Sequence, residues 1–258
     1  MSERELDGRV VIVFGAGSSG HGLSNGEAAA LAYARAGALV AAVDRDTAEA
    51  ERVAKAITAS GGAALAVTAD VTVEADVGAA IELVVRTMGP PHVLHNNVGA
   101  AVSGELAVTD LDTWNHGIAV NLTSAYLTCR YTIPHMLAAG RGAIVNVSSL
   151  AAIRDTGYVY PVYSAAKAGL NQLTVSLALT HARDGLRANA VLPGLIDTPM
   201  VARQVTADPG ARHAASPTGR MGSPHDVANA SVFLASDRAA YVNGVCLPVD
   251  GGLSARST

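Results

Sequence analysis

Cysteine, aromatic residues and clustered positive charge are all scarce in this sequence. Cys129 and Cys246 are its only cysteines and lie far apart, which argues against a disulfide framework or a thiolate metal site. Phe, Trp and Tyr together make up 4% of the residues, so Trp114 and its few companions form no stacking platform. Lys and Arg form no basic stripe and the net charge is -4, so nucleic acid is not an expected partner.

Long apolar runs and export signals are also missing. Apolar stretches such as Val10 to Phe14 are far too short to span a bilayer, and charged residues crowd the amino terminus. We therefore expect a cytoplasmic protein without a membrane partner. His92 and His95 lie three residues apart in an expected strand and would face opposite sides, so no metal site is predicted.

What the chain does contain is a regular alternation of strand and helix patterns. Its 50% hydrophobic content is ample for a core. Short β-branched or apolar runs alternate with alanine-rich segments of helical length, which is typical of a parallel sheet covered by helices. Strands are expected at Val10 to Phe14, Leu39 to Val43, Ala64 to Val67, His92 to Leu94, Ala143 to Val147, Arg187 to Leu192 and Val245 to Val249. Helices are expected near 25–36, 46–59, 73–87, 109–138, 161–182 and 224–235.

This order predicts an α/β protein: residues 1–258 form one doubly wound, Rossmann-like domain, a single parallel sheet of about seven strands with helices on both faces. One segment departs from the pattern. Residues 197–220 contain Pro199, Pro209, Gly210, Pro217 and Gly219, and we expect them to form a loop with broken helix that acts as a mobile lid.

A glycine-rich turn follows the first expected strand and reads Gly15-Ala16-Gly17-Ser18-Ser19-Gly20-His21-Gly22-Leu23-Ser24-Asn25-Gly26-Glu27. Backbone amides in such a turn can approach a pyrophosphate closely, although a long surface loop is the alternative. The first three glycines match the dinucleotide spacing literally. Ser24 and Glu27, however, form a capping-box pattern that places the helix start near Ser24 to Asn25. We therefore treat the literal match as a decoy and expect the phosphate beside Ser24 and Asn25.

The same turn supports a competing hypothesis from another reaction class. Gly22-Leu23-Ser24-Asn25-Gly26 satisfies the G-x-S-x-G pattern of a serine-hydrolase nucleophile elbow, and a later histidine such as His225 could complete a triad. An elbow needs its serine at the tip of the strand. The strand here is expected to end near Phe14, well before Ser24, which argues against a hydrolase.

Asp44 ends the second expected strand. In a dinucleotide fold this position needs an acid that binds the adenosine ribose hydroxyls, which favours NAD over NADP. The alternative is that Asp44 caps the helix that follows. Its place at the carboxyl end of a buried strand favours the ribose role.

The pair Tyr163 and Lys167 is the sharpest chemical pattern in the chain. On a helix, residues four apart project from one face, so the lysine ammonium can lie near the phenol. Free tyrosine titrates near ~10, and a nearby cation favours the phenolate and lowers that value. The spacing therefore predicts a tyrosine that exchanges a proton with an alcohol. By itself the pattern is common, and an ordinary helix surface is the alternative.

In context, the sequence resembles the short-chain dehydrogenase/reductase family along nearly its whole length. The motifs that match in order are the glycine-rich turn, Asp44, Asp70-Val71, His95-Asn96-Asn97-Val98-Gly99, Asn121, Ser148-Ser149, Tyr163 with Lys167, Pro193-Gly194-Leu195-Ile196-Asp197-Thr198-Pro199, Asn243-Gly244 and Val249-Asp250-Gly251-Gly252. Departures from the family pattern are Phe14 in place of Thr, Val98 in place of Ala, and a longer glycine-rich turn.

The resemblance implies a hydride transfer between nicotinamide and a small-molecule alcohol or ketone. It makes Tyr163 the general acid/base, Ser149 (or its neighbour Ser148) the donor to the reacting oxygen, and Asn121 the holder of a relay water. Lys167 would bind the nicotinamide ribose and lower the Tyr163 pKa. The implied cofactor-binding residues are Gly15, Ser18, Ser24, Asn25, Gly26, Asp44, Asp70, Val71, Asn97, Gly99, Tyr163, Lys167, Pro193, Gly194, Ile196 and Thr198.

The resemblance also implies a homotetramer or dimer that assembles through the helices near 109–138 and 161–182 and the strand Val245 to Val249. A protein that senses a dinucleotide without catalysis remains an alternative on the same fold. The set Asn121, Ser149, Tyr163 and Lys167 argues for catalysis, because a sensor needs no tuned phenol.

Overall fold

The computed structural model describes residues 4–18, 20, 22–200 and 209–256, and its centre is a single sheet of seven strands. The strands are β1 (Val10–Phe14), β2 (Leu39–Asp44), β3 (Ala63–Thr68), β4 (Val93–Asn96), β5 (Gly142–Val147), β6 (Leu186–Pro193) and β7 (Cys246–Val249). They lie in the order β3-β2-β1-β4-β5-β6-β7, and every neighbouring pair is parallel. The predicted Rossmann-like fold is confirmed.

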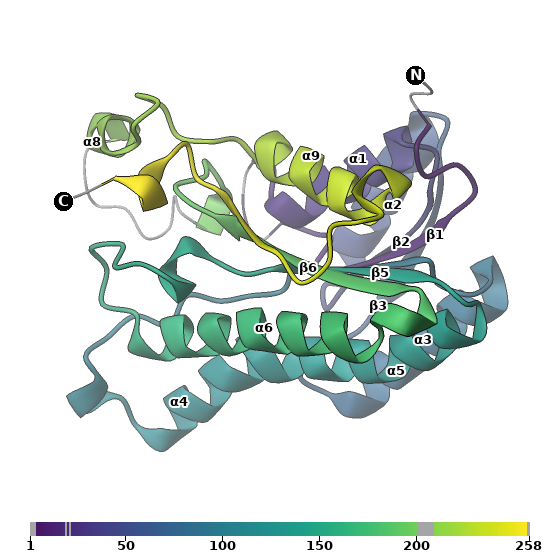
Figure 1. Cartoon of the computed structure of the whole chain (residues 1–258), viewed down its shortest axis with the longest axis horizontal. Coiled ribbons are helices and arrows are strands. Elements are labelled where there is room, and N and C mark those ends of the chain that lie inside the picture. Colours follow the sequence, from purple (N-terminus) through teal and green to yellow (C-terminus); the bar gives the residue numbers. More distant parts are fainter. Residues whose placement is uncertain (1–3, 19, 21, 201–208, 257–258) are drawn as a thin grey trace.

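Helices cover both faces of this sheet (Figure 1). One face carries α1 (Asn25–Arg35), α2 (Thr47–Ala59) and α9 (Pro224–Ala235). The other carries α3 (Glu74–Met88), α5 (Ser124–Ala138) and α6 (Pro161–Thr180). Two shorter helices, α4 (Leu111–Ile118) and α8 (Pro209–Ala215), lie toward one end of the molecule.

Strand β1 shows why the sequence forms two cores. Val11 and Val13 belong to one apolar cluster, which α1 and α9 cover, and Val10, Ile12 and Phe14 belong to the other, beneath α3 and α5. Alternate residues of a strand point to opposite faces, so a central strand that is covered on both sides must be apolar throughout. An uninterrupted Val-Val-Ile-Val-Phe run is the result.

The helix expected near 109–138 is present as an unbroken helical run from Leu111 to Ala138, but it is not α-helical throughout. It consists of α4, a π-helical turn at Ala119–Thr123, and α5. A π-helical turn accommodates an extra residue without breaking the helix axis, and it recurs at functional sites. Here it contains Asn121.

The strand order reverses between β1 and β4, because β1 pairs with β2 on one side and with β4 on the other. Connections leave the sheet in opposite directions at this point, so a crevice opens beyond the carboxyl ends of the strands. Of the expected lid at 197–220, residues 201–208 lie outside the described residues. Among the described helices, none is both long enough and apolar enough for a membrane crossing.

Candidate active site

A pocket of about 1230 Å³ occupies the crevice at the carboxyl ends of the strands. The predicted site residues that line it are Gly15, Ser18, Ser24, Asn25, Asp44, Asp70, Val71, Asn97, Gly99, Ser149, Tyr163, Lys167, Pro193, Gly194, Ile196 and Thr198. Gly26 and Asn121, which were also predicted as site residues, are not among the residues that line it. The described residues hold no group of three or more His, Cys, Asp and Glu side chains that could bind a metal.

Helix α1 begins at Asn25, as the capping pattern predicts. The Ser24 hydroxyl accepts a hydrogen bond from the Glu27 amide at 3.0 Å and donates to the Gly17 carbonyl at 2.8 Å. Ser24 is therefore a helix cap that also ties down the turn, and β1 ends well before it. These positions rule out the nucleophile elbow of a hydrolase.

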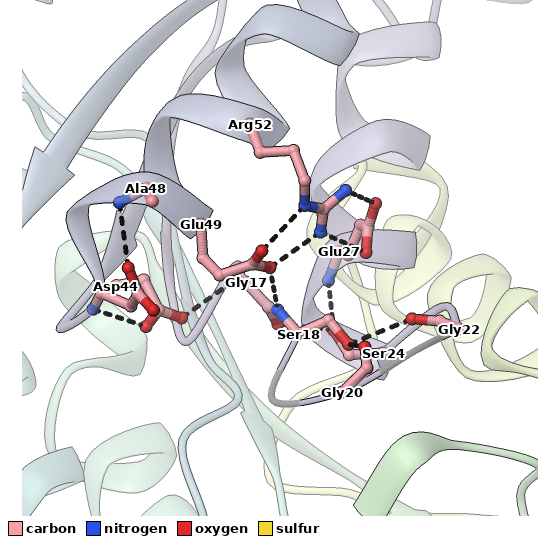
Figure 2. Close-up of polar contacts among 11 residues, drawn as sticks. Gly17, Ser18, Gly20, Gly22, Ser24, Glu27, Asp44, Ala48, Glu49 and Arg52 are labelled. Carbon is pink, nitrogen blue, oxygen red and sulfur yellow. Dashed lines mark hydrogen bonds and ion pairs between the residues drawn. The ribbon is translucent and has the colours of Figure 1, made fainter.

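Only half of the predicted capping box forms. The Glu27 carboxylate does not return to the helix start but pairs with both terminal nitrogens of Arg52, at 2.7 and 2.8 Å. Arg52 also contacts Glu49, which precedes it by one helical turn (Figure 2). Glu49 and Arg52 were not predicted as site residues, because only the tertiary fold brings α2 against the glycine-rich turn.

Two carboxylates hold two successive amides of this turn (Figure 2). Asp44 accepts from the Gly17 amide at 2.9 Å, and Glu49 accepts from the Ser18 amide at 2.7 Å. The pKa of Glu49 lies below its usual value, mainly because Arg52 donates to its carboxylate. Asp46, not Asp44, caps α2 by accepting from the Ala48 amide, so the capping role considered for Asp44 is wrong.

Close backbone approach explains the glycine at Gly26. A Cβ there would lie 1.9 Å from the Gly15 carbonyl oxygen and 2.6 Å from the side-chain nitrogen Nδ2 of Asn97. The same Nδ2 donates to the Gly15 carbonyl at 3.0 Å, and this hydrogen bond joins the end of β4 to the turn after β1. On the neighbouring wall, Asp70 is held by the amide and hydroxyl of Thr72, whose hydrogen bonds lower its pKa.

At the other end of the pocket, Tyr163 lies on α6 in hydrogen-bond contact with Ser149. The Ser149 hydroxyl also accepts from the Ala151 amide at 3.1 Å. Ser148 is buried and donates to the Lys167 carbonyl, so between the two serines it is Ser149 that meets the phenol. Lys167 is fully buried one helical turn after Tyr163, with its ammonium 5.8 Å from the centre of the phenol ring.

The pKa of Tyr163 does not shift in the direction expected from its spacing to Lys167. Burial raises the pKa of Tyr163, and the hydrogen bond with Ser149 lowers it in part. Burial also lowers the pKa of Lys167 to about 8. Lys167 is not among the groups that shift the Tyr163 pKa. Its amine instead donates to the Val147 carbonyl at 2.9 Å.

Asn121 is 1% exposed and its side chain is fully engaged. The amide oxygen accepts from the Ala100 amide at 3.0 Å, and the amide nitrogen donates to the carbonyls of Ala100 and Gly117, each at 2.9 Å. The side chain thus fixes the loop after β4 against the helix that carries the π-helical turn. A Cβ on Gly99 would lie 3.1 Å from both the Asn121 amide oxygen and the Lys167 ammonium, so glycine lets these groups approach.

Comparisons with known proteins agree with this geometry. A family model described as enoyl-(acyl carrier protein) reductase matches residues 21–254. The chain belongs to the short-chain dehydrogenase/reductase family. It is 44% identical to cis-4-hydroxycyclohexanecarboxylate dehydrogenase of Sinomonas cyclohexanicum over 96% of this chain and 97% of that protein.

Two further relatives extend the comparison. The chain is 41% identical to a protein of Xanthobacter autotrophicus named inactive 2-(S)-hydroxypropyl-CoM dehydrogenase 2, over 88% of this chain and 99% of that one. A crystal structure of a short-chain dehydrogenase/reductase from Burkholderia xenovorans superposes with a TM-score of 0.94 at 41% identity, covering 98% and 99% of the two chains. Members of this family use a nicotinamide cofactor, NAD or NADP.

Proposed function

We propose that this protein is an NAD(H)-dependent oxidoreductase that moves hydride between nicotinamide and the carbon of a secondary alcohol or ketone, with Tyr163 as general acid/base. The observation that carries the proposal is the contact between Tyr163 and Ser149 at the pocket wall, with Lys167 buried behind it. Relatives named for the oxidation of cyclohexanol and of a hydroxycyclohexanecarboxylate support a secondary alcohol as substrate.

The residues of the pocket suit a dinucleotide. The amino-terminal end of α1 faces the pocket at Ser24 and Asn25, and helix amino termini bind phosphates well. The Asn25 amide oxygen is buried with no hydrogen-bond partner in the described residues, so a hydroxyl group of a bound dinucleotide could donate to it. Gly26 and Gly15 keep the turn compact enough for backbone amides to reach a pyrophosphate.

The bound nicotinamide would supply the hydride acceptor and, when oxidised, a positive charge at the pocket wall. In alcohol oxidation, Ser149 donates a hydrogen bond to the substrate oxygen while Tyr163 accepts the hydroxyl proton. Burial favours the neutral phenol, so forming the phenolate requires cations nearby. Lys167 provides one such cation from the next turn of α6.

Asn121 is expected to hold a relay water. Because its side chain already makes hydrogen bonds to the protein, we assign this role to its backbone carbonyl.

The preference for NAD follows from Asp44. Its carboxylate can accept from both ribose hydroxyls, whereas the 2′-phosphate of NADP would meet a like charge. Two unit charges about 5 Å apart repel by roughly 3 kcal/mol at an effective dielectric near 20. Arg45, which also lines the pocket, could recover part of this cost by turning toward the phosphate. We expect Asp44 to prevail.

We also propose that the protein is a homo-oligomer, a tetramer or dimer, that assembles through α4 to α6 and β7. Exposed apolar side chains on these helices support this proposal. Leu111, Tyr126 and Leu179 are 70%, 46% and 75% exposed, and a subunit contact would bury this apolar surface.

The test of the proposed function is Tyr163→Phe with a panel of secondary alcohols. NADH formation is expected to fall by about 10²- to 10⁴-fold, because the proton acceptor is lost. NAD binding, measured by calorimetry, should persist. Tyr160→Phe is the matched control, since Tyr160 packs edge-on against Tyr163 with ring centres 5.8 Å apart. Equal losses in the two variants would overturn the role of Tyr163, and no turnover by the parent with any alcohol would favour a sensing protein.

A further inference from the structure

The charged residues of the pocket are divided along its length. Asp44, Asp46, Glu49 and Asp70 line the end near the glycine-rich turn, with Arg45 among them. Arg154, Arg212 and Arg256 line the opposite end, beyond Tyr163, where Asp155 is the acidic residue. The dinucleotide argument accounts for the acidic end. It does not account for the three arginines.

These arginines make their hydrogen bonds to uncharged groups. Arg154 donates to the Ser254 carbonyl at 3.1 Å, and Arg256 donates to the Ala215 carbonyl at 3.4 Å. Asp155 accepts from the Gly157 amide at 2.9 Å. Within the described ranges, none of the three guanidinium groups is in an ion pair. The positive charge at this end of the pocket is therefore not neutralised by the described residues.

Arg212 is the most telling of the three, because it is only 8% exposed. Its Nη2 donates to the Tyr158 hydroxyl at 2.8 Å, and its guanidinium lies 5.7 Å from the centre of the Tyr158 ring. Its Nη1 is buried with no acceptor among the residues that the structure describes. A buried cationic donor without an acceptor costs free energy, and an anion that enters the pocket would remove that cost.

Aromatic contacts connect this arginine to the reacting group. Tyr158 stacks on Tyr160 with ring centres 5.3 Å apart, and Tyr160 packs edge-on against Tyr163. Leu195, Met200 and Leu253 add aliphatic surface to the pocket lining. A substrate could therefore place its carbinol carbon at Tyr163 and an anionic group at Arg212, with a hydrocarbon spacer between them.

We propose that this end of the pocket is an anion subsite, and that the substrate is a secondary alcohol or ketone that carries a carboxylate or a sulfonate. Arg212 supplies the fixed donor through Nη1, and Arg154 and Arg256 supply attraction at the rim. This inference rests on the proposed oxidoreductase function for the alcohol, but the subsite itself can be tested without turnover.

The experiment is calorimetric binding of cyclohexanecarboxylate, cyclohexanesulfonate and the neutral cyclohexanecarboxamide to the parent enzyme in the presence of NADH. Either anion, or both, should bind at least about 10-fold more tightly than the amide. Arg212→Gln should weaken anion binding by about 10- to 100-fold, which is typical for one charge-assisted hydrogen bond, and leave the amide unchanged. Arg212→Lys should lie between the two. Arg220→Gln is the matched control, because Arg220 lies in the same segment but does not line the pocket.

Equal binding of the anions and the amide by the parent would overturn the subsite, and so would equal loss of both in Arg212→Gln. If Arg212→Gln does not fold, Arg256→Gln should still reduce anion binding selectively. Turnover separates the two proposals. Anion-selective binding in a protein that oxidises no alcohol would leave the subsite standing and reject the oxidoreductase. Oxidation of 4-methylcyclohexanol with no preference for 4-hydroxycyclohexanecarboxylate would reject the subsite and leave the oxidoreductase standing.

Discussion

The Glu49 carboxylate accepts from the Ser18 amide one residue beyond the Gly17 amide that donates to Asp44. Two negative charges therefore border the place where a ribose 2′-substituent would enter, and Arg52 neutralises part of the second. Cofactor selection in this protein is thus expected to depend on two residues, the acid that ends β2 and one from the first turns of α2.

Removing these charges should shift the enzyme toward NADP. Asp44→Ala is expected to raise the ratio of kcat/KM for NADP over NAD by roughly 100-fold, from the repulsion of a like charge about 5 Å away. Glu49→Gln should raise it by a smaller factor, because Arg52 already offsets that charge. Steady-state kinetics with both cofactors measures the ratio. Glu51→Gln, on the exposed side of α2, is the control; a parent that uses NADP equally well would show that neither acid selects.

Arg52 is expected to matter for stability as well as for the turn. Glu27 is 7% exposed and pairs with Arg52 through both of its oxygens. Arg52→Met leaves that carboxylate without its partner and should lower the free energy of unfolding by about 1 to 2 kcal/mol, less than for a fully buried pair because the Arg52 side chain is 45% exposed. Urea denaturation gives the value. The double variant with Glu27→Gln should recover part of the loss, and an unchanged midpoint in Arg52→Met would show that the pair contributes nothing.

Lys167 should reduce stability at neutral pH. Burial lowers its pKa from 10.5 to about 8, so folding is opposed while the amine is protonated, by on the order of 3 kcal/mol. This cost is fully present below pH 8 and disappears as the pH rises toward 10.5. Lys167→Met should therefore have a higher free energy of unfolding than the parent at pH 7. The lost hydrogen bond to the Val147 carbonyl reduces this gain by about 1 kcal/mol. Denaturation at pH 7 and pH 10 should show the difference shrinking; a constant difference would contradict the prediction.

Gly26 should tolerate no side chain. Because a Cβ would lie 1.9 Å from the Gly15 carbonyl oxygen, Gly26→Ala must displace the turn and is expected to cost about 3 kcal/mol or more. Cofactor affinity should fall with it. Gly78→Ala is the control, since its Cβ would meet the edge of the Tyr131 ring at 3.2 Å and alanine favours a helix by up to about 1 kcal/mol. Similar losses in both variants would mean that helix packing, not the turn, is the cause.

Much of the fold was predictable because its determinants are local. A β-branched run such as Val10–Phe14 is typical of a strand that is buried on both faces, as in the middle of a parallel sheet, and Ser24 with Glu27 marks the start of α1 within one helical turn. The spacing of Tyr163 and Lys167 likewise depends on helix geometry alone. The π-helical turn at Ala119–Thr123 was missed because apolar periodicity does not distinguish it from a turn of ordinary α-helix.

By itself, the sequence determined the alternation of strands and helices and the helix start at the glycine-rich turn. Only the tertiary structure decided which charges meet. Glu27 lies 25 residues from Arg52, and Tyr158 lies 54 residues from Arg212, and neither spacing predicts a contact. The direction of the Tyr163 pKa also depended on burial, because desolvation is set by every element packed around a group, whereas the spacing to Lys167 reports a single neighbour.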